Sequence, residues 1–164
     1  MTDSPHLLTA AHIAEGDAKH VQHQFNANAI RQTRTLSAPT GLQRLGIHQV
    51  TLDPGRDSTT HHTHDADEEF LYILSGTGRA RIGDDYFEVG PGDFMGFPAG
   101  SPAHSLTNTG DTPLTYLMGG ERNAVDVVHY PDLNRVMMKR PDQNGETERL
   151  WADLPNVHLV EQRE

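Results

Sequence analysis

The sequence of 164 residues contains no cysteine. Disulfide bonds, a cysteine nucleophile and metal sites built on thiolates are therefore excluded. Basic residues are also few, because 13 lysines and arginines stand against 23 aspartates and glutamates and leave a formal net charge of −10. No basic run offsets this charge locally, so we expect neither nucleic acid nor an anionic membrane as a partner.

Long apolar segments are missing as well. The N-terminal residues 1–6 lack the basic start and apolar stretch of a signal peptide, and no segment approaches the length of a membrane span. The chain has no repeat of solenoid length and no low-complexity tract. We therefore expect one domain that buries its own core, in a soluble cytoplasmic protein.

The central part of the chain alternates between apolar and polar residues with a period of two. This pattern begins at Leu42, and the turn Asp53-Pro54-Gly55 ends the first run. Further strand candidates, separated by turns rich in Gly, Pro and Asp, are residues 61–64, 69–74, 79–82, 86–89, 94–97, 104–107, 114–118 and 124–130. Short strands at such spacings predict an all-β sandwich or barrel rather than a parallel βαβ sheet.

The two ends of the chain do not share this pattern. Residues 1–40 are mixed and polar, with a short amphipathic helix expected within 10–20, and they are interpreted as an N-terminal arm. Residues 41–130 then form the β-barrel domain. Residues 131–164 form a charged C-terminal tail in which Trp151 is the strongest apolar anchor, expected to pack on the barrel or on a neighbouring subunit.

Histidine is the residue type that stands out. His62 and His64 are two residues apart, so on an extended segment both imidazoles point to the same face. Glu69 follows after a loop that can return it to that face, and His104 begins an apolar strand after the turn 98–102. Three imidazole nitrogens and one carboxylate oxygen are a typical ligand set for a mononuclear metal ion.

These residues resemble the cupin family. Its first motif, G-x5-H-x-H followed by three or four residues, E, six residues and G, is matched by His62, His64, Glu69 and Gly76. Its second motif, G-x5-P-x-G-x2-H-x3-N, is matched by Gly92, Pro98, Gly100, His104 and Asn108. The resemblance covers about residues 42–120.

The chain departs from the two motifs in turns. Six residues rather than five separate Gly55 from His62, and three rather than two separate Gly100 from His104. The first insertion permits a rival pairing, in which His61 and Thr63 take the positions of His62 and His64. We favour His62 and His64, because they keep the H-x-H spacing to Glu69.

The resemblance implies a double-stranded β-helix, or jelly-roll cupin barrel, that forms a homodimer. It also implies one divalent metal ion, Fe, Mn, Ni or Zn, held near one mouth by His62, His64, Glu69 and His104. Glu69 and His104 are in addition the expected catalytic residues. A small-molecule substrate or ligand is the expected partner.

Three functions remain open at this point. The first is isomerisation or epimerisation of a sugar or sugar phosphate, and the second is an Fe(II) dioxygenase reaction. The third is a binding module, without catalysis, for a sugar or an organic acid.

A few further residues have two interpretations each. His48 is either a core histidine or a group that lines the pocket. Arg79 and Arg81 alternate with Ala80 and Ile82, which indicates a solvent-facing strand edge or a clamp for a substrate anion. Asn108 is expected to hold a turn.

Overall fold

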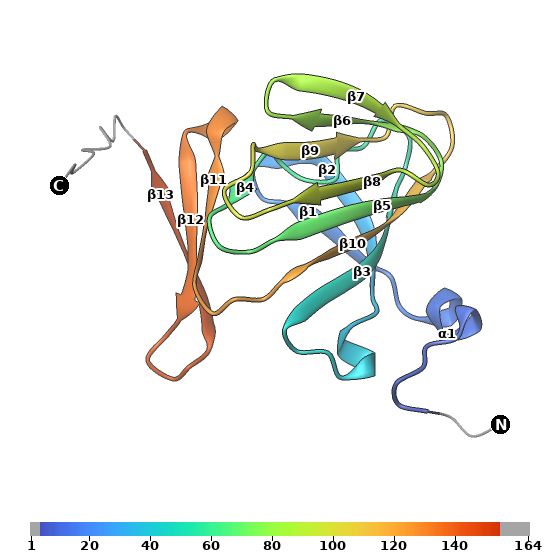
Figure 1. Ribbon diagram of the computed structural model, residues 1–164, viewed down its shortest axis with the longest axis horizontal. Helices are drawn as coiled ribbons and strands as arrows, with labels where there is room; N and C mark the ends of the chain where they lie inside the picture. The colour runs from blue at the N-terminus through green and yellow to red at the C-terminus, as the bar shows by residue number, and fades with distance from the viewer. Residues whose placement is uncertain (1–3, 155–164) are drawn as a thin grey trace.

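Nearly all of the regular structure is β-strand, as the alternating pattern predicts. A computed structural model describes residues 4–154 and gives that range thirteen strands and one short α-helix (Figure 1). The elements are α1 (Ala10–Glu15), β1 (Lys19–His23), β2 (Asn26–Thr35), β3 (Leu45–Leu52), β4 (Thr63–His64), β5 (Glu69–Ser75), β6 (Gly78–Ile82), β7 (Asp85–Val89), β8 (Phe94–Phe97), β9 (His104–Thr107), β10 (Leu114–Glu121), β11 (Asp126–Tyr130), β12 (Arg135–Pro141) and β13 (Thr147–Asp153). The helix α1 lies within the range expected for it.

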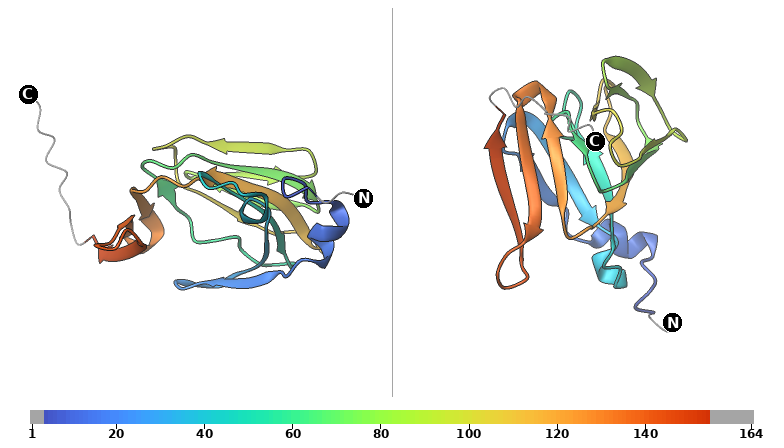
Figure 2. Two further views of the ribbon diagram at one scale, coloured as in Figure 1. Left: turned by 90° about the horizontal axis from the view of Figure 1, so that it is seen from below. Right: turned by 60° about the vertical axis from the view of Figure 1, so that its left-hand side comes forward.

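The strands form three antiparallel sheets. The largest has the order β1-β2-β3-β10-β5-β8, and the smallest has the order β7-β6-β9. These two sheets face each other across the core, and the sheet β13-β12-β11-β4 stands at one end of them (Figures 1 and 2). The all-β class predicted from the strand pattern is confirmed, and so is the jelly-roll barrel that the resemblance implies.

The core lies between the two facing sheets. Its fully buried members come from alternate positions of β3, β5, β9 and β10, as a period of two requires. They include Val50, Leu52, Ile73, Leu106 and Leu114, each at most 1% exposed. Burial of this apolar surface is the main favourable contribution to folding.

Asn108 holds the turn between β9 and β10. Its side-chain amide donates to the backbone oxygens of Leu52 and Thr112, at 2.9 Å each, and its Oδ1 accepts from the backbone N–H of Gly110 at 3.0 Å. The side chain is fully buried. The expectation that Asn108 holds a turn is confirmed.

The strands β1 and β2 lie in the segment interpreted as a plain N-terminal arm. They form a hairpin that joins the main sheet through β2 and β3. The inward-facing positions of β2 include Ala29, Arg31 and Thr33, so small and polar residues take the places where large apolar ones reveal a strand. That composition explains why the sequence pattern did not show these strands.

The C-terminal strands close one end of the barrel. Trp151 of β13 packs against Phe25, at 4.9 Å between ring centroids, and against Tyr130 of β11, at 5.3 Å. The guanidinium of Arg135 lies 4.5 Å from the centre of the Phe25 ring. Trp151 therefore joins the N-terminal hairpin to the C-terminal sheet.

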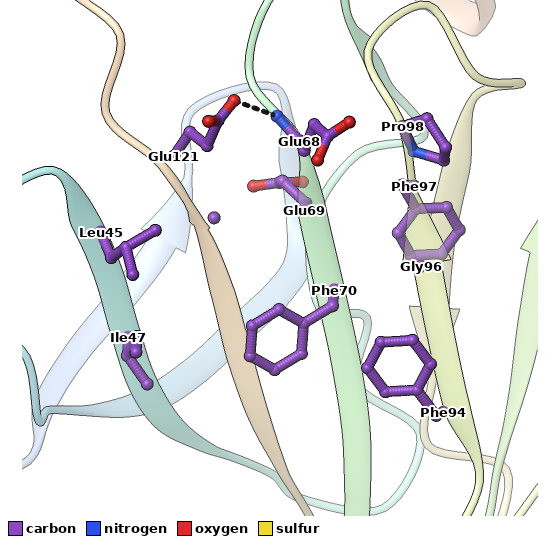
Figure 3. Close-up of a pocket in the computed structure, with 11 residues that line it drawn as sticks. Leu45, Ile47, Glu68, Glu69, Phe70, Phe94, Gly96, Phe97, Pro98 and Glu121 are labelled. Carbon is purple, nitrogen blue, oxygen red and sulfur yellow. Dashed lines mark hydrogen bonds between the residues drawn. The ribbon is translucent and has the colours of Figure 1, made fainter.

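The outer face of the largest sheet carries an apolar groove. Figure 3 shows Leu45 and Ile47 of β3 opposite Phe70 and Phe94, and the Phe94 side chain is 64% exposed. The Phe70 ring lies directly on Gly119, where an added Cβ would be 2.2 Å from a ring carbon.

The homodimer expected from the resemblance stays a prediction. Among residues 4–154, no helix has the length and hydrophobicity that a membrane crossing requires.

We predict that Asn108→Ala destabilises the fold by about 1–3 kcal/mol, because it leaves the buried carbonyl of Leu52 without its donor. Urea unfolding followed by circular dichroism measures this change. The neighbouring exposed Thr109 provides the matched control, since Thr109→Ala removes no such bond and should leave the midpoint within error. Equal midpoints for the two variants would contradict the assigned role of Asn108.

Candidate metal centre

Three imidazoles converge on one carboxylate oxygen at the end of the barrel. The Nε2 atoms of His62, His64 and His104 lie 3.6, 3.5 and 3.2 Å from Oε2 of Glu69. The ring of His62 is 5.1 Å from that of His64 and 4.7 Å from that of His104, between centroids. All four residues predicted from the two motifs are therefore brought together.

These spacings suit a metal ion. Two ligand atoms that each lie about 2.0–2.1 Å from one ion are about 3.0–3.4 Å apart at ordinary coordination angles. The three separations between Nε2 and Oε2 fall in or close to this range. Imidazole nitrogen with carboxylate oxygen is also a donor set that divalent first-row metals accept. The cluster fits a divalent metal ion, whose identity it leaves open.

Each ligand is held by the fold. His62 and His104 pair across a β-bridge, in which each backbone N–H donates to the other's carbonyl, at 3.1 and 2.7 Å. His64 belongs to β4, which pairs with β11, and Glu69 begins β5 in the main sheet. Three sheets thus contribute to one site, and rigid strands fix the separations between the ligands.

Outer hydrogen bonds orient two of the rings. Nδ1 of His62 donates to the backbone oxygen of Thr60 at 2.9 Å, and Nδ1 of His64 donates to Oδ2 of Asp126 at 2.6 Å. With Nδ1 held as a donor, Nε2, the atom that faces Glu69, is the nitrogen that can offer its lone pair to a metal ion. The ring of His104 is fixed differently, since it stacks on Phe97 with 3.6 Å between centroids.

The protonation states of Glu69 and His104 also favour binding of a cation. Burial raises the pKa of Glu69, but hydrogen bonds with His104 and His62 outweigh it and hold that pKa well below its usual range. Burial lowers the pKa of His104, against the opposing effect of its hydrogen bond to Glu69. Glu69 is therefore an anion at neutral pH and His104 a neutral ring, the forms in which both act as ligands.

Asp126 is a functional residue that sequence reasoning missed. Its carboxylate is 2% exposed and also accepts from the backbone N–H groups of Ala66 and Asp67. The hydrogen bond with His64 joins residues 62 positions apart in the chain. No local motif marks such a partner, because only the pairing of β4 with β11 brings it close.

The rival pairing of His61 with Thr63 does not reach the cluster. Nδ1 of His61 lies 3.4 Å from Oγ of Ser105, and Oγ1 of Thr63 donates to the backbone oxygen of Ser101. His61 is buried but contacts none of the atoms around Oε2 of Glu69. His62 and His64 are thus the pair that faces inward.

Other histidines and arginines of the central region also lie away from the cluster. Arg79 pairs with Glu88 and Arg81 with Asp132 on the outside of the small sheet, so neither enters the barrel. His129 pairs with Asp65 at the surface. His48 faces inward beside Arg122 and Arg31, and burial lowers its pKa.

An inner cavity of about 230 Å³ adjoins the four ligands. Its apolar wall includes Leu71, Met118, Val128 and Met137, and its polar lining includes His23, Arg31, Ser58, Thr59, Tyr116 and Tyr130. The sequence predicts Tyr116 as a core aromatic, or as a proton donor if it faces inward near the metal. It marks neither His23 nor Arg31, because both lie in the segment interpreted as an arm.

A family model for the cupin domain matches residues 48–120. Over nearly the whole chain, the fold is similar to the crystal structure of a protein from Acidithiobacillus ferrooxidans that is provisionally named a sugar phosphate isomerase. The two share 36% sequence identity and a TM-score of 0.87, over 96% of this chain and 97% of the other. The chain belongs to the cupin family.

Two further structures resemble this cupin. A sugar phosphate isomerase of the cupin superfamily from Silicibacter pomeroyi is 26% identical, with a TM-score of 0.72 over 84% of this chain and 86% of the other. A predicted oxalate decarboxylase from Thermotoga maritima is 21% identical, with a TM-score of 0.59 over 68% of this chain and 96% of the other, which shows the common fold.

A curated relative that matches part of the chain carries no named activity. This uncharacterized protein from Methanocaldococcus jannaschii is 38% identical over 64 residues, which are 39% of the cupin chain. The match spans half of the relative's own length.

We predict that His104→Gln and His62→Gln abolish binding of a stoichiometric divalent ion, whereas His61→Gln retains it. The reason is that His61 is an equally buried neighbour whose ring faces Ser105 instead of Glu69. Elemental analysis of protein purified without added metal gives the measurement. Equal metal content in His61→Gln and His104→Gln would contradict the four-ligand centre.

We further predict that Asp126→Asn weakens metal affinity by about 10- to 100-fold, as is typical when an outer hydrogen-bond partner is altered. The substitution keeps the shape of the side chain but weakens the acceptor that orients His64. Competition with a fluorescent chelator measures the affinity, and Asp65→Asn, on the exposed carboxylate that pairs with His129, is the matched control. An unchanged affinity in Asp126→Asn would show that this hydrogen bond does not tune the centre.

Proposed function

We propose that this cupin is a metal-dependent enzyme that isomerises or epimerises a small sugar or sugar phosphate. His62, His64, Glu69 and His104 are the proposed ligands of one divalent ion. The observation that carries the proposal is the convergence of three Nε2 atoms on Oε2 of Glu69 beside a cavity. The similarity to the two proteins named as sugar phosphate isomerases supports this choice of reaction.

A bound divalent ion supplies Lewis-acid polarisation of the hydroxyl and carbonyl oxygens that an isomerase must activate. Glu69 and His104, expected from the sequence to be catalytic, take part in this proposal as ligands. The hydrogen bonds that keep Glu69 ionised make it a strong ligand and a weak proton acceptor. The base that takes the substrate proton must therefore be another group, and the substrate oxygen also needs a hydrogen-bond donor from the cavity lining.

His23 is the candidate for this donor. The backbone N–H of Phe25 donates to its Nδ1 at 3.3 Å, and the hydroxyl of Thr60 lies 3.0 Å from the same atom. A ring nitrogen that accepts a backbone N–H carries no proton itself, so the neutral ring is protonated at Nε2. Burial lowers the pKa of His23 and favours this neutral form. Nε2–H can then donate to a substrate oxygen.

The apolar wall of the cavity affects the solvation of a bound substrate. Leu71, Met118, Val128 and Met137 reduce the water around a bound substrate, which strengthens its polar contacts with the remaining lining residues. The cavity of about 230 Å³ is smaller than the 300–1,000 Å³ common for sites of drug-sized ligands. A substrate of a few carbon atoms is therefore favoured.

We predict that the metal-loaded protein interconverts at least one aldose and ketose phosphate, or one epimer pair, without oxygen. Nuclear magnetic resonance of a panel of three- to six-carbon substrates detects the product. His104→Gln should abolish turnover because it removes a ligand, and Arg79→Met should leave turnover unchanged because Arg79 lies outside the barrel.

Two results would replace the proposal. Oxygen consumption coupled to cleavage of catechols or diketones, with no anaerobic turnover, would establish the dioxygenase. Saturable binding of a sugar without turnover in either assay would establish a binding module.

A further inference from the structure

Arg31 is placed in the interior by the register of β2. It alternates with Ala29 and Thr33, which are 1% and 9% exposed, so its side chain leaves the sheet on the same inner face. There it lines the cavity that also contains His62, His64, Glu69 and His104. It is the arginine that borders this cavity within the described residues.

The guanidinium of Arg31 is incompletely paired. Its Nη1 donates to the backbone oxygen of Ser58 at 3.1 Å, while its buried Nε has no hydrogen-bond partner among the described atoms. Arginines 79, 81, 135 and 140 each pair with a carboxylate, but no carboxylate of the described residues pairs with Arg31. A partly buried charge without a counter-ion is unfavourable, so this group favours an anion beside it.

Tyr116 contributes a second unpaired group to the same cavity. The residue is fully buried, and its hydroxyl has no partner among the described atoms. Burial raises the pKa of Tyr116 to about 12, against the opposing effect of the Arg31 charge, so the hydroxyl is a neutral donor that lies near Arg31. An unsatisfied buried donor is unfavourable, and a ligand oxygen would satisfy it.

Arg31 lines two neighbouring hollows. A second hollow, lined by Val21, Gln24 and Trp151 among others, shares His23, Arg31, Ser58 and Thr59 with the inner cavity. The lining of the inner cavity therefore holds both the four candidate metal ligands and a lone cation, and this cation also lines the second hollow. Such an arrangement suits a ligand with neutral oxygens at one end and a negative group at the other.

We propose that Arg31 and Tyr116 form an oxyanion subsite, and that the substrate carries a phosphate or carboxylate group bound there. The reaction assigned to the substrate rests on the proposed function, whereas binding of an anion at this subsite does not depend on it. The subsite specifies that function by selecting sugar phosphates or sugar acids over uncharged sugars. The guanidinium fork and the phenol would together offer at least two charge-assisted or neutral donors to the anion.

The test measures anion binding without turnover. Inorganic phosphate and acetate are titrated separately, at constant ionic strength, into the protein as purified and after removal of metal by a chelator. A bound anion raises the thermal unfolding midpoint in a saturable way. We expect Arg31→Met to weaken the apparent affinity at least about tenfold, because a charged hydrogen-bond donor is lost. Arg79→Met is the control of equal chemistry at the surface, and its affinity should not change.

Two milder variants guard against a loss of folding in Arg31→Met. Tyr116→Phe removes only the hydroxyl, and Arg31→Lys keeps the charge without the planar fork. Both should weaken binding of whichever anion the wild type prefers. The wild-type preference itself distinguishes phosphate from carboxylate. The subsite is overturned if no saturable stabilisation occurs, if Arg31→Met and Tyr116→Phe bind as the wild type does, or if binding disappears when only the metal is removed.

The same design separates this inference from the proposed reaction. Anion binding that depends on Arg31, in a protein that turns over no substrate of the panel, supports the subsite and refutes the isomerase. Turnover of an uncharged sugar as efficiently as of its phosphate, with no effect of Arg31→Met on KM, supports the isomerase and refutes the subsite.

Discussion

The central constraint of this structure is that three imidazoles surround one carboxylate oxygen. Without a cation, Glu69 keeps its charge in this place only because His104 and His62 supply hydrogen bonds. The fold maintains the arrangement through three sheets, since β4, β5 and the bridge between His62 and His104 belong to different pairings. Such a cluster has few conformational alternatives, and it can exchange its hydrogen bonds for metal bonds with little movement of the backbone.

Much of this centre could be predicted from the sequence, because its information is local. His62 and His64 lie two residues apart, which places them on one face of an extended segment, and His104 begins a strand after a turn of glycine and proline. The alternation that revealed β3, β5 and β10 arises from the same periodicity, since each buries one face against the core. Local spacing therefore gave both the barrel and its four candidate ligands.

The remaining parts depend on contacts between distant segments. Asp126 approaches His64 only through strand pairing, and Arg31 enters the cavity from a strand whose inner face is small or polar. Hydrophobic alternation cannot identify such a strand, because a polar inward residue looks like a solvent-exposed one in the sequence. The residues that sequence reasoning missed are thus those that give the cavity its polarity, and local consistency is expected to fail at functional sites.

The position of Trp151 has a practical consequence for studying this protein. It is the one tryptophan of the chain, and it touches Tyr130, whose ring stacks on His62 with 5.9 Å between centroids. It also lines the hollow that leads toward Arg31. Its fluorescence therefore comes from a single known location beside this hollow, and selective excitation of the indole would report ligand binding there without an added label.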